Sequence, residues 1–326
     1  MVSGFSEFSW DVYTDGYFWV DGFKDPPAGP EQGFSPGRYL VVQYDKSWLQ
    51  IPKFQKKQYN LFQNYDPLLD VGALFKTFAN VDPSEAGIAI FASKYGQLGG
   101  DIAKTCYVWH QLLPPLLDTE LSALPFSIDG KYPYYRFFGE TLRGWRSEIK
   151  VMKRAVALWE HLKAGKKRPV RFHLENEWGT EAVACLRQDE IIIKGHELLR
   201  DDINKHLLKR ISPEVQLGHS KEDLGLKIVP DSLIGAIWLQ FALAVDGDKE
   251  YRLCDVCKEK WFELRPGKNR KDREYCSDAC RLRAYRERKN EARQKYKDGM
   301  TIEEIAKELK SKPDTVRGWV EKLMSN

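Results

Sequence analysis

Residues 254–280 read CDVCKEKWFELRPGKNRKDREYCSDAC, and the four cysteines of this stretch decide how the C-terminal part of the chain folds. Two residues separate Cys254 from Cys257, eighteen residues follow, and three residues separate Cys276 from Cys280. This spacing is typical of a zinc site with four thiolate ligands. A helix over the second pair would place both of its sulfur atoms on one face.

The sequence around the cysteines predicts a knuckle, a hairpin and a helix held together by one zinc ion. Ser277 and Asp278 suit the N-cap and the first turn of that helix. Trp261, Phe262 and Leu264 give the small module an apolar side. So short a segment buries too little core to fold alone, so we expect the metal to supply the folding free energy. Four thiolates close the coordination shell, which predicts a structural zinc rather than a catalytic one.

Two other states of the cysteines stay open, namely four unligated thiols and two disulfides. Disulfides are disfavoured because the first residues, MVSGFSEFSW, lack the charged and apolar regions of a signal peptide. The longest apolar run, residues 232–245, is too short to span a bilayer and contains Gln240. We therefore expect a cytoplasmic location without a membrane segment.

The length and composition predict a packed chain with several parts, and the order of the expected elements predicts an α+β fold. Of 326 residues, 42% are hydrophobic and 13% are aromatic, which indicates a packed core rather than disorder. The predicted parts are an aromatic-rich β segment over 1–64, a mostly helical body for sensing or dimerisation over 65–248, a treble-clef-like zinc finger with four cysteine ligands over 249–285, and a basic helix with a helix-turn-helix over 286–326.

Periodicity assigns elements within the body. Helices are predicted over 140–164 and 230–245, where apolar residues recur at helical intervals or fill every side. Residues 168–194 are predicted as strands, because apolar and charged side chains alternate near residue 172 and EIII at 190–193 resembles a buried strand. A further helix is expected over 196–210.

The net charge of +4 is unevenly distributed. Residues 250–326 hold 21 Lys and Arg against 15 Asp and Glu, whereas the rest of the chain holds 30 against 32. The basic excess is greatest in residues 258–297, with 15 basic and 7 acidic residues. This distribution is typical of a terminus that binds nucleic acid. The alternative is a tail that is charged only for solubility.

The residues after Cys280 predict three helices. Residues 281–299 form a continuous basic helix that ends at Gly299. Two helices with apolar faces are predicted over 302–309 and 313–323, joined by a short turn, which is the pattern of a helix-turn-helix. An ordinary helical hairpin is the alternative. Two side chains of the basic helix are expected to close the small core, Ala292 and Tyr296.

WFEL at 261–264, followed by REYCSDACRLRAYRER at 273–288, resembles the zinc finger of bacterial CGNR-type proteins and of a related set of bacterial zinc-finger proteins. Residues 65–99 and 232–245 resemble the body of that set. The CGNR group is regarded as transcription regulators, so the resemblance implies a bacterial regulator. Residues 281–282 are Arg and Leu where the name motif has Gly and Asn, so the metal ligands carry over and the name motif does not.

Two further resemblances broaden the expected partners. The finger is also similar to treble-clef and FCS-type fingers, several of which bind proteins. Residues 299–323 are similar to the helix-turn-helix of resolvase-like and homeodomain-like DNA binders, with Lys310 at a turn position where Gly is common. Besides DNA binding, the sequence therefore admits a protein-interaction scaffold that docks a partner through the finger, and RNA binding.

The DNA-binding prediction assigns roles to particular side chains. Those expected to neutralise phosphates are Arg281, Arg283, Arg286, Arg288, Lys289 and Arg293. Those expected near base edges, at the start of the last helix, are Lys312, Asp314, Thr315 and Arg317. Arg317 is the candidate for a guanine contact, with an ordinary surface charge as the alternative. Because a single helix-turn-helix reads few bases, a homodimer on duplex DNA is expected.

No catalytic constellation is recognisable. The sequence has no Walker loop, no G-x-G-x-x-G after a strand and no G-x-S-x-G. His196 and Glu197 begin like a zinc-protease motif, but position 200 is Arg instead of the second histidine. The sequence therefore predicts a binding protein and not an enzyme.

Overall fold

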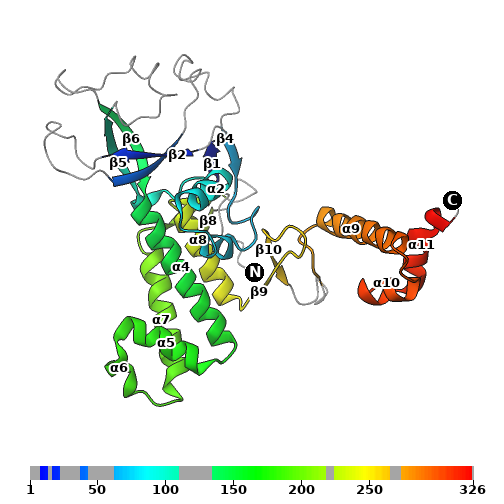
Figure 1. Ribbon diagram of the computed structural model, residues 1–326. Coiled ribbons are helices and arrows are strands. Elements are labelled where there is room, and N and C mark those ends of the chain that lie inside the picture. The colour runs from blue at the N-terminus through cyan, green and yellow to red at the C-terminus, as the bar shows by residue number, and fades with distance from the viewer. Residues whose placement is uncertain are drawn as a thin grey trace. The chain divides into compact units, whose positions relative to one another are not determined.

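The computed structural model of the chain describes residues 8–13, 17–22, 37–42, 62–109, 134–217, 224–264 and 273–324 (Figure 1). The chain divides into two compact units, Met1–Asp248 and Lys249–Asn326. Helices are combined with small sheets, as expected for the α+β class. Of the helices in these ranges, none has the length and apolar character needed to cross a lipid bilayer.

The first unit carries an antiparallel four-stranded sheet in the order β2-β3-β6-β5. Its strands are β2 (Tyr17–Gly22), β3 (Gly37–Val42), β5 (Ala103–Trp109) and β6 (Tyr134–Thr141). A separate antiparallel pair is formed by β1 (Trp10–Tyr13) and β4 (Phe62–Tyr65). The aromatic-rich N-terminal residues thus include strands, and one of their sheets is completed by strands from beyond residue 100.

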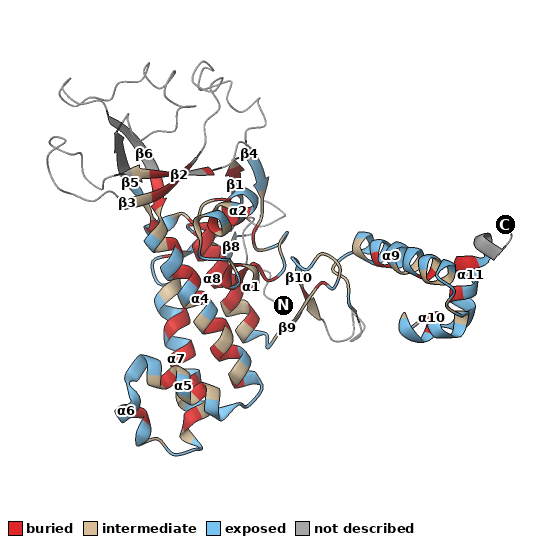
Figure 2. Cartoon of the chain, viewed as in Figure 1, coloured by how far each residue is buried: buried red, intermediate tan, exposed pale blue. Residues whose placement is uncertain are grey.

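Seven α-helices and one 3-10 turn are described in the first unit. They are α1 (Leu74–Ala79), α2 (Glu85–Tyr95), η3 (Gly100–Ile102), α4 (Leu142–Lys163), α5 (Lys167–Trp178), α6 (Thr180–Ala184), α7 (Glu190–Leu207) and α8 (Leu233–Asp246). Buried residues concentrate on α1, α4 and α8 (Figure 2). The largest fully buried side chains are aromatic: Trp145, Trp238, Phe75, Phe78 and Phe241. These helices therefore share one aromatic core.

The predicted helix over 230–245 is confirmed as α8. The Ser232 hydroxyl caps it by accepting a hydrogen bond from the Gly235 N–H at 3.2 Å. Gln240, the polar residue in its apolar run, is buried and reaches the start of α1. Its Oε1 accepts from the Phe75 N–H at 3.3 Å, and its Nε2 donates to the Val71 carbonyl at 2.6 Å. Gln240 therefore gives a partner to the Phe75 N–H, which has no partner within α1, and ties the chain just before α1 to α8.

The strands predicted over 168–194 are wrong, because α5, α6 and the start of α7 occupy these residues. In α5, Val170 and Leu174 are fully buried, whereas Phe172 between them is exposed. Positions i and i+4 share a helix face, so a short alternating pattern also fits a helix. The run at 190–193 opens α7 and buries Ile191. The residues just before α8 form a hairpin that periodicity did not predict, with β7 (Ile211–Leu217) paired to β8 (Leu224–Pro230).

A buried carboxyl group lies where β6 leads into α4. Glu140 is fully buried, its Oε1 accepts a hydrogen bond from the Gly99 N–H, and its Oε2 has no hydrogen-bond partner among the described residues. Burial raises the pKa of Glu140 to about 7. An unfolded glutamate has a pKa of about 4.3. Between these values the folded chain binds the extra proton, so stability falls as pH rises from about 4.5 to about 7.

We expect Glu140→Gln to remove this pH dependence, because the amide keeps an acceptor for Gly99 and carries no charge. At pH 8 the variant should be more stable than the wild type by about 1–3 kcal/mol, and at pH 4.5 the two should differ little. Urea unfolding at both pH values measures this. Glu181→Gln, at an exposed position on α6, is the control. Equal pH profiles for the wild type and Glu140→Gln would contradict a buried, protonated Glu140.

Candidate metal centre

The first cysteine pair lies in the turn between β9 (Glu250–Leu253) and β10 (Trp261–Leu264), which pair antiparallel. The Cys254 N–H donates to the Lys260 carbonyl at 2.9 Å, and the Lys258 N–H donates to the Cys254 carbonyl at 3.0 Å. Lys258 has φ 53°, the left-handed conformation that turns the chain back after Cys257. These bonds form the predicted knuckle and aim both thiols to one side.

The second cysteine pair lies at the start of α9 (Asp278–Lys297). The Ser277 hydroxyl accepts a hydrogen bond from the Cys280 N–H at 3.3 Å, and Asp278 stands in the first turn, which confirms the predicted cap and anion. The expectation that both cysteines share a helix face is wrong for Cys276. Because Ser277 is the cap, Cys276 precedes the helix and only Cys280 belongs to it.

Arg273 braces the chain that leads into the second pair. Its guanidinium donates to the carbonyls of Tyr275 at 2.8 Å and Cys276 at 2.7 Å, and it lies 4.8 Å from the centre of the Phe262 ring on β10. The Asp255 N–H in the knuckle donates to the Glu274 carbonyl at 3.1 Å. The sequence reasoning missed this role of Arg273. An arginine three residues before a ligand cysteine was the available signal.

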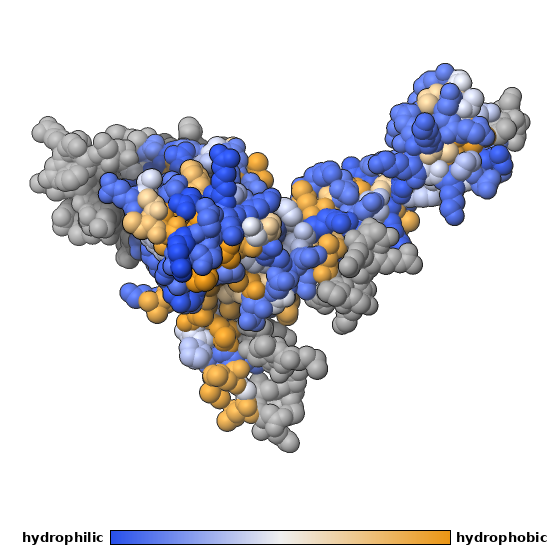
Figure 3. All heavy atoms as spheres, turned by 90° about the horizontal axis from the view of Figure 1, so that it is seen from below, coloured by the Kyte–Doolittle hydropathy of each residue, from blue (hydrophilic) through white to orange (hydrophobic). Residues whose placement is uncertain are grey.

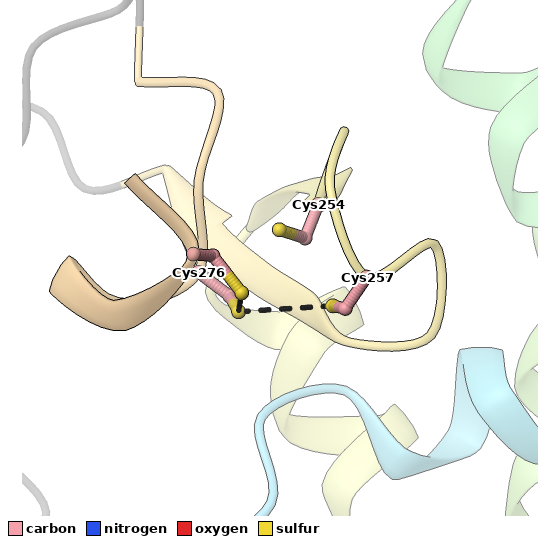
Figure 4. Close-up of side chains that lie close together, drawn as sticks. Cys254, Cys257 and Cys276 are labelled. Carbon is pink, nitrogen blue, oxygen red and sulfur yellow. Dashed lines mark hydrogen bonds between the residues drawn. The ribbon is translucent and has the colours of Figure 1, made fainter. Parts of the chain in front are cut away.

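The four sulfur atoms lie within 4.8 Å of one another. The distance from Cys257 Sγ to Cys276 Sγ is 3.9 Å, and the distance from Cys276 Sγ to Cys280 Sγ is 3.6 Å. In Figure 4 the thiols of Cys254, Cys257 and Cys276 point towards a common centre. A tetrahedral ion with metal–sulfur bonds of about 2.3 Å sets sulfurs about 3.8 Å apart. The four cysteines are therefore close enough to bind one metal ion.

The pKa values of Cys254 and Cys276 are shifted in opposite directions. Burial opposes ionisation of Cys254, yet backbone N–H groups of Cys257, Cys276 and Val256 favour its thiolate, and the net effect lowers its pKa to about 6. Burial, together with the neighbouring thiols of Cys280 and Cys254, raises the pKa of Cys276 to about 12. Of these two thiols, Cys254 is therefore the more readily ionised. A divalent cation at the centre would favour the thiolate form of all four.

α9, which carries Cys280 in its first turn, is followed by α10 (Ile302–Glu308) and α11 (Pro313–Met324). A capping box between Thr301 and Glu304 starts α10, and Lys310, with φ 46°, reverses the chain before α11. The three helices α9, α10 and α11 share a small core, whose buried residues are Ala292, Ile305, Ala306, Val316 and Trp319. Tyr296 packs against it, so the third side predicted from Ala292 and Tyr296 is confirmed.

The residues predicted to contact phosphates differ in their surroundings. Two are exposed and ion-paired on α9, Arg281 to Asp278 at 3.2 Å and Arg283 to Glu287 at 2.9 Å. Arg293 is half-buried and donates to the Trp319 carbonyl at 2.8 Å, so it ties α9 to α11. Arg288 donates to the Ala284 carbonyl at 3.4 Å within its own helix.

The other two residues predicted to contact phosphates are Arg286 and Lys289. Arg286 is exposed, Lys289 is half-buried, and neither forms an ion pair or hydrogen bond with the residues that the structure describes. Near the start of α11, the residues predicted to face base edges are all exposed: Lys312, Asp314, Thr315 and Arg317. Arg317 pairs with Asp314 at 3.2 Å. The chain thus presents cationic side chains on α9 and polar ones at the start of α11.

The fold and the site define a protein in which a four-cysteine cluster joins a β-hairpin to the first of three helices. Comparison with protein-family models gave no match, and neither the curated proteins nor the solved structures gave one.

Proposed function

We propose that this chain is a DNA-binding protein, a transcription regulator, whose four cysteines hold one structural zinc ion. One observation carries the proposal: the sulfurs that gather within 4.8 Å include one in the first turn of α9, a helix with exposed cationic side chains. An ion bound there would fix the direction of that helix against the β9–β10 knuckle. Cationic side chains on a helix that is held in one direction lose less conformational entropy on binding phosphates than those on a freely moving helix.

The choice of zinc follows from ligand chemistry. Four thiolates form a soft donor set, which favours zinc, iron or copper(I) over magnesium or calcium. The set has no histidine or carboxylate and leaves no place for a water molecule, which suits a closed structural site. Metal analysis of the purified chain checks the identity of the ion.

The arrangement of α10 and α11 supports duplex DNA as the partner. Two short helices with a common core are joined through Leu309–Lys312, and the exposed side chains stand at the start of the second helix. A helix-turn-helix presents the N-terminal residues of its second helix to base edges in the major groove. Thr315 and Arg317 would be the base-reading side chains, and Arg317 would have to leave Asp314 to reach a guanine.

Salt dependence of DNA binding tests the proposal. We expect the affinity of the full chain for a duplex to fall steeply with salt, because phosphate contacts release counterions. Replacing both Arg286 and Lys289 with Gln should weaken binding and lower the slope by about one unit for each lost contact. Titrations of the variants over a series of salt concentrations measure the slope.

A matched control lies on the same helix. Lys295 is paired with Glu308 and Glu291, so Lys295→Gln removes one positive charge, half of what the double variant removes, from a side chain that is already neutralised. The slope should change little in this variant. A duplex affinity that does not respond to salt, or equal slopes for all variants, would rule out phosphate contacts by α9.

A second candidate function is a protein-interaction scaffold, because α9 also exposes apolar side chains. Leu282 and Tyr285 are both solvent-accessible on the turn that follows the cluster. Binding to a protein partner through them would be insensitive to salt and sensitive to Leu282→Asp. RNA binding is a third candidate, and competition between duplex DNA and structured RNA for the same chain separates it from the first.

A further inference from the structure

The β7–β8 hairpin of the first unit carries an exposed apolar face. Val215 lies opposite Leu226 and Pro213 lies opposite Ile228, so their side chains share one face of the ribbon, and Leu224 joins them two positions from Leu226. Val215 is 66% exposed, Leu226 67%, Leu224 73% and Ile228 36%. Figure 3 shows hydrophobic residues, in orange, reaching the surface among hydrophilic ones. On this hairpin such residues lie side by side across two strands.

The opposite face of the ribbon has a different character. Glu214 lies directly across from Lys227, and Ser212 is exposed two residues before Glu214, with Val229 across from it as the apolar member of this face. This alternation of an apolar and a mainly polar face is what a sheet shows when one side is covered by another layer. A two-stranded hairpin with one apolar face is marginal in water without such a layer. The β7–β8 ribbon therefore has the residue pattern of a sheet whose apolar face packs against another layer. In this structure that apolar face is exposed.

Because the apolar face carries no charge, it suits some kinds of partner and not others. Its side chains carry no charge, whereas nucleic acid or an anionic membrane would be met by Lys and Arg. A second copy of the chain presents the same neutral surface, and a two-fold axis through the face would set Val215 and Leu226 of one copy against those of the other. We propose that the β7–β8 ribbon packs face to face on the ribbon of a second copy and makes the protein a homodimer.

The area available agrees with a weak, specific dimer. Five apolar side chains bury on the order of 60–120 Å² each when covered, or roughly 300–600 Å² per copy. Stable interfaces bury about 800 Å² per partner, and transient ones less. We expect a dissociation constant of about micromolar order, so the monomer and dimer exchange with concentration. This dimerisation does not require DNA, so it goes beyond the proposed function. If the proposed function also holds, the dimer would bring two DNA-reading units together about one symmetry axis.

The test is the oligomeric state of the full chain without DNA, by sedimentation equilibrium from about 1 to 100 μM. We expect a monomer–dimer equilibrium. Val215→Lys and Leu226→Lys should each raise the dissociation constant by about tenfold or more, because each places two charges in a neutral interface. Ser212→Lys is the matched control, since it adds the same charge to the opposite face of the same strand, and it should leave the constant within about twofold. Circular dichroism confirms that each variant is folded.

A second measurement locates the contact. A photo-crosslinking phenylalanine analogue at Leu226 should yield covalent dimers on irradiation, and the same analogue at Ser212 should yield none. A chain that stays monomeric at about 100 μM overturns the proposal. So do dimers that both lysine variants leave unchanged. Absence of DNA binding in a chain that dimerises through the ribbon would remove the proposed function and leave this inference standing.

Discussion

Replacing Cys276 with Ser should release the metal ion and abolish DNA binding while the first unit stays folded. Cys276 has the most sulfur contacts in the cluster, to Cys257 at 3.9 Å and to Cys280 at 3.6 Å, and a serine oxygen is a poor ligand for a soft ion. A structural zinc site supplies about 10–16 kcal/mol to the fold around it, more than a segment of this size can replace. We expect metal content to fall from one ion per chain to nearly none, and DNA affinity to fall by about 100-fold or more.

Elemental analysis, duplex titration and thermal unfolding measure these three effects. Cys185→Ser is the matched control, because Cys185 is an exposed cysteine of the first unit and lies outside the cluster. It should keep the metal and the DNA affinity. Full affinity in a metal-free Cys276→Ser variant would show that the ion does not position α9. Loss of the first unit's unfolding transition would show that the two units do not fold separately.

The clustering of the four cysteines could be predicted from the sequence because paired cysteines at this spacing are a local pattern. The two cysteine pairs, the Ser277 cap and the Gly299 stop are local signals, and of these only Cys276 is displaced, because it precedes the helix. The three-helix core was predictable for the same reason, since a helix repeats its apolar face over a few residues. Local rules failed where a short run was consistent with two periods, as at Val170 and Leu174 in α5.

Long-range contacts could not be predicted in this way. Gln240 caps a helix that lies 165 residues earlier in the chain, and no local pattern announces that contact. Arg293 resembles the other arginines of the basic helix in sequence, yet its guanidinium holds the backbone of Trp319. A run of arginines predicts a cationic helix, but only the fold separates the side chains that brace neighbours from those that face solvent. The proposed phosphate contacts are therefore tested at Arg286 and Lys289, which form no ion pair with the described residues.

Replacing Trp319 with Ala should unfold α10 and α11 while the metal ion stays bound. Trp319 is buried in the three-helix core, its ring meets the Tyr285 ring edge-on at 5.7 Å, and its Nε1 donates to the Tyr285 hydroxyl at 3.0 Å. Removing a buried tryptophan costs about 3–5 kcal/mol. A core this small supplies about as much in total, so the helices should lose their packing. None of the four cysteines belongs to this core, so we expect the chain to keep the proposed metal ion.

Trp319→Ala separates the proposed role of α10 and α11 from that of the metal-held α9, whereas Cys276→Ser removes both roles. If α10 and α11 read the DNA, Trp319→Ala should keep one ion per chain and retain only the weak, sequence-independent affinity of α9. Tyr285→Phe is the control, since it deletes only the hydroxyl and should cost about 0.5–1.5 kcal/mol with little effect on binding. Selection of bound sequences from a random duplex pool measures the difference. If Trp319→Ala selected the same sequences as the wild type, base reading would have to lie in α9, and the last two helices would serve another partner.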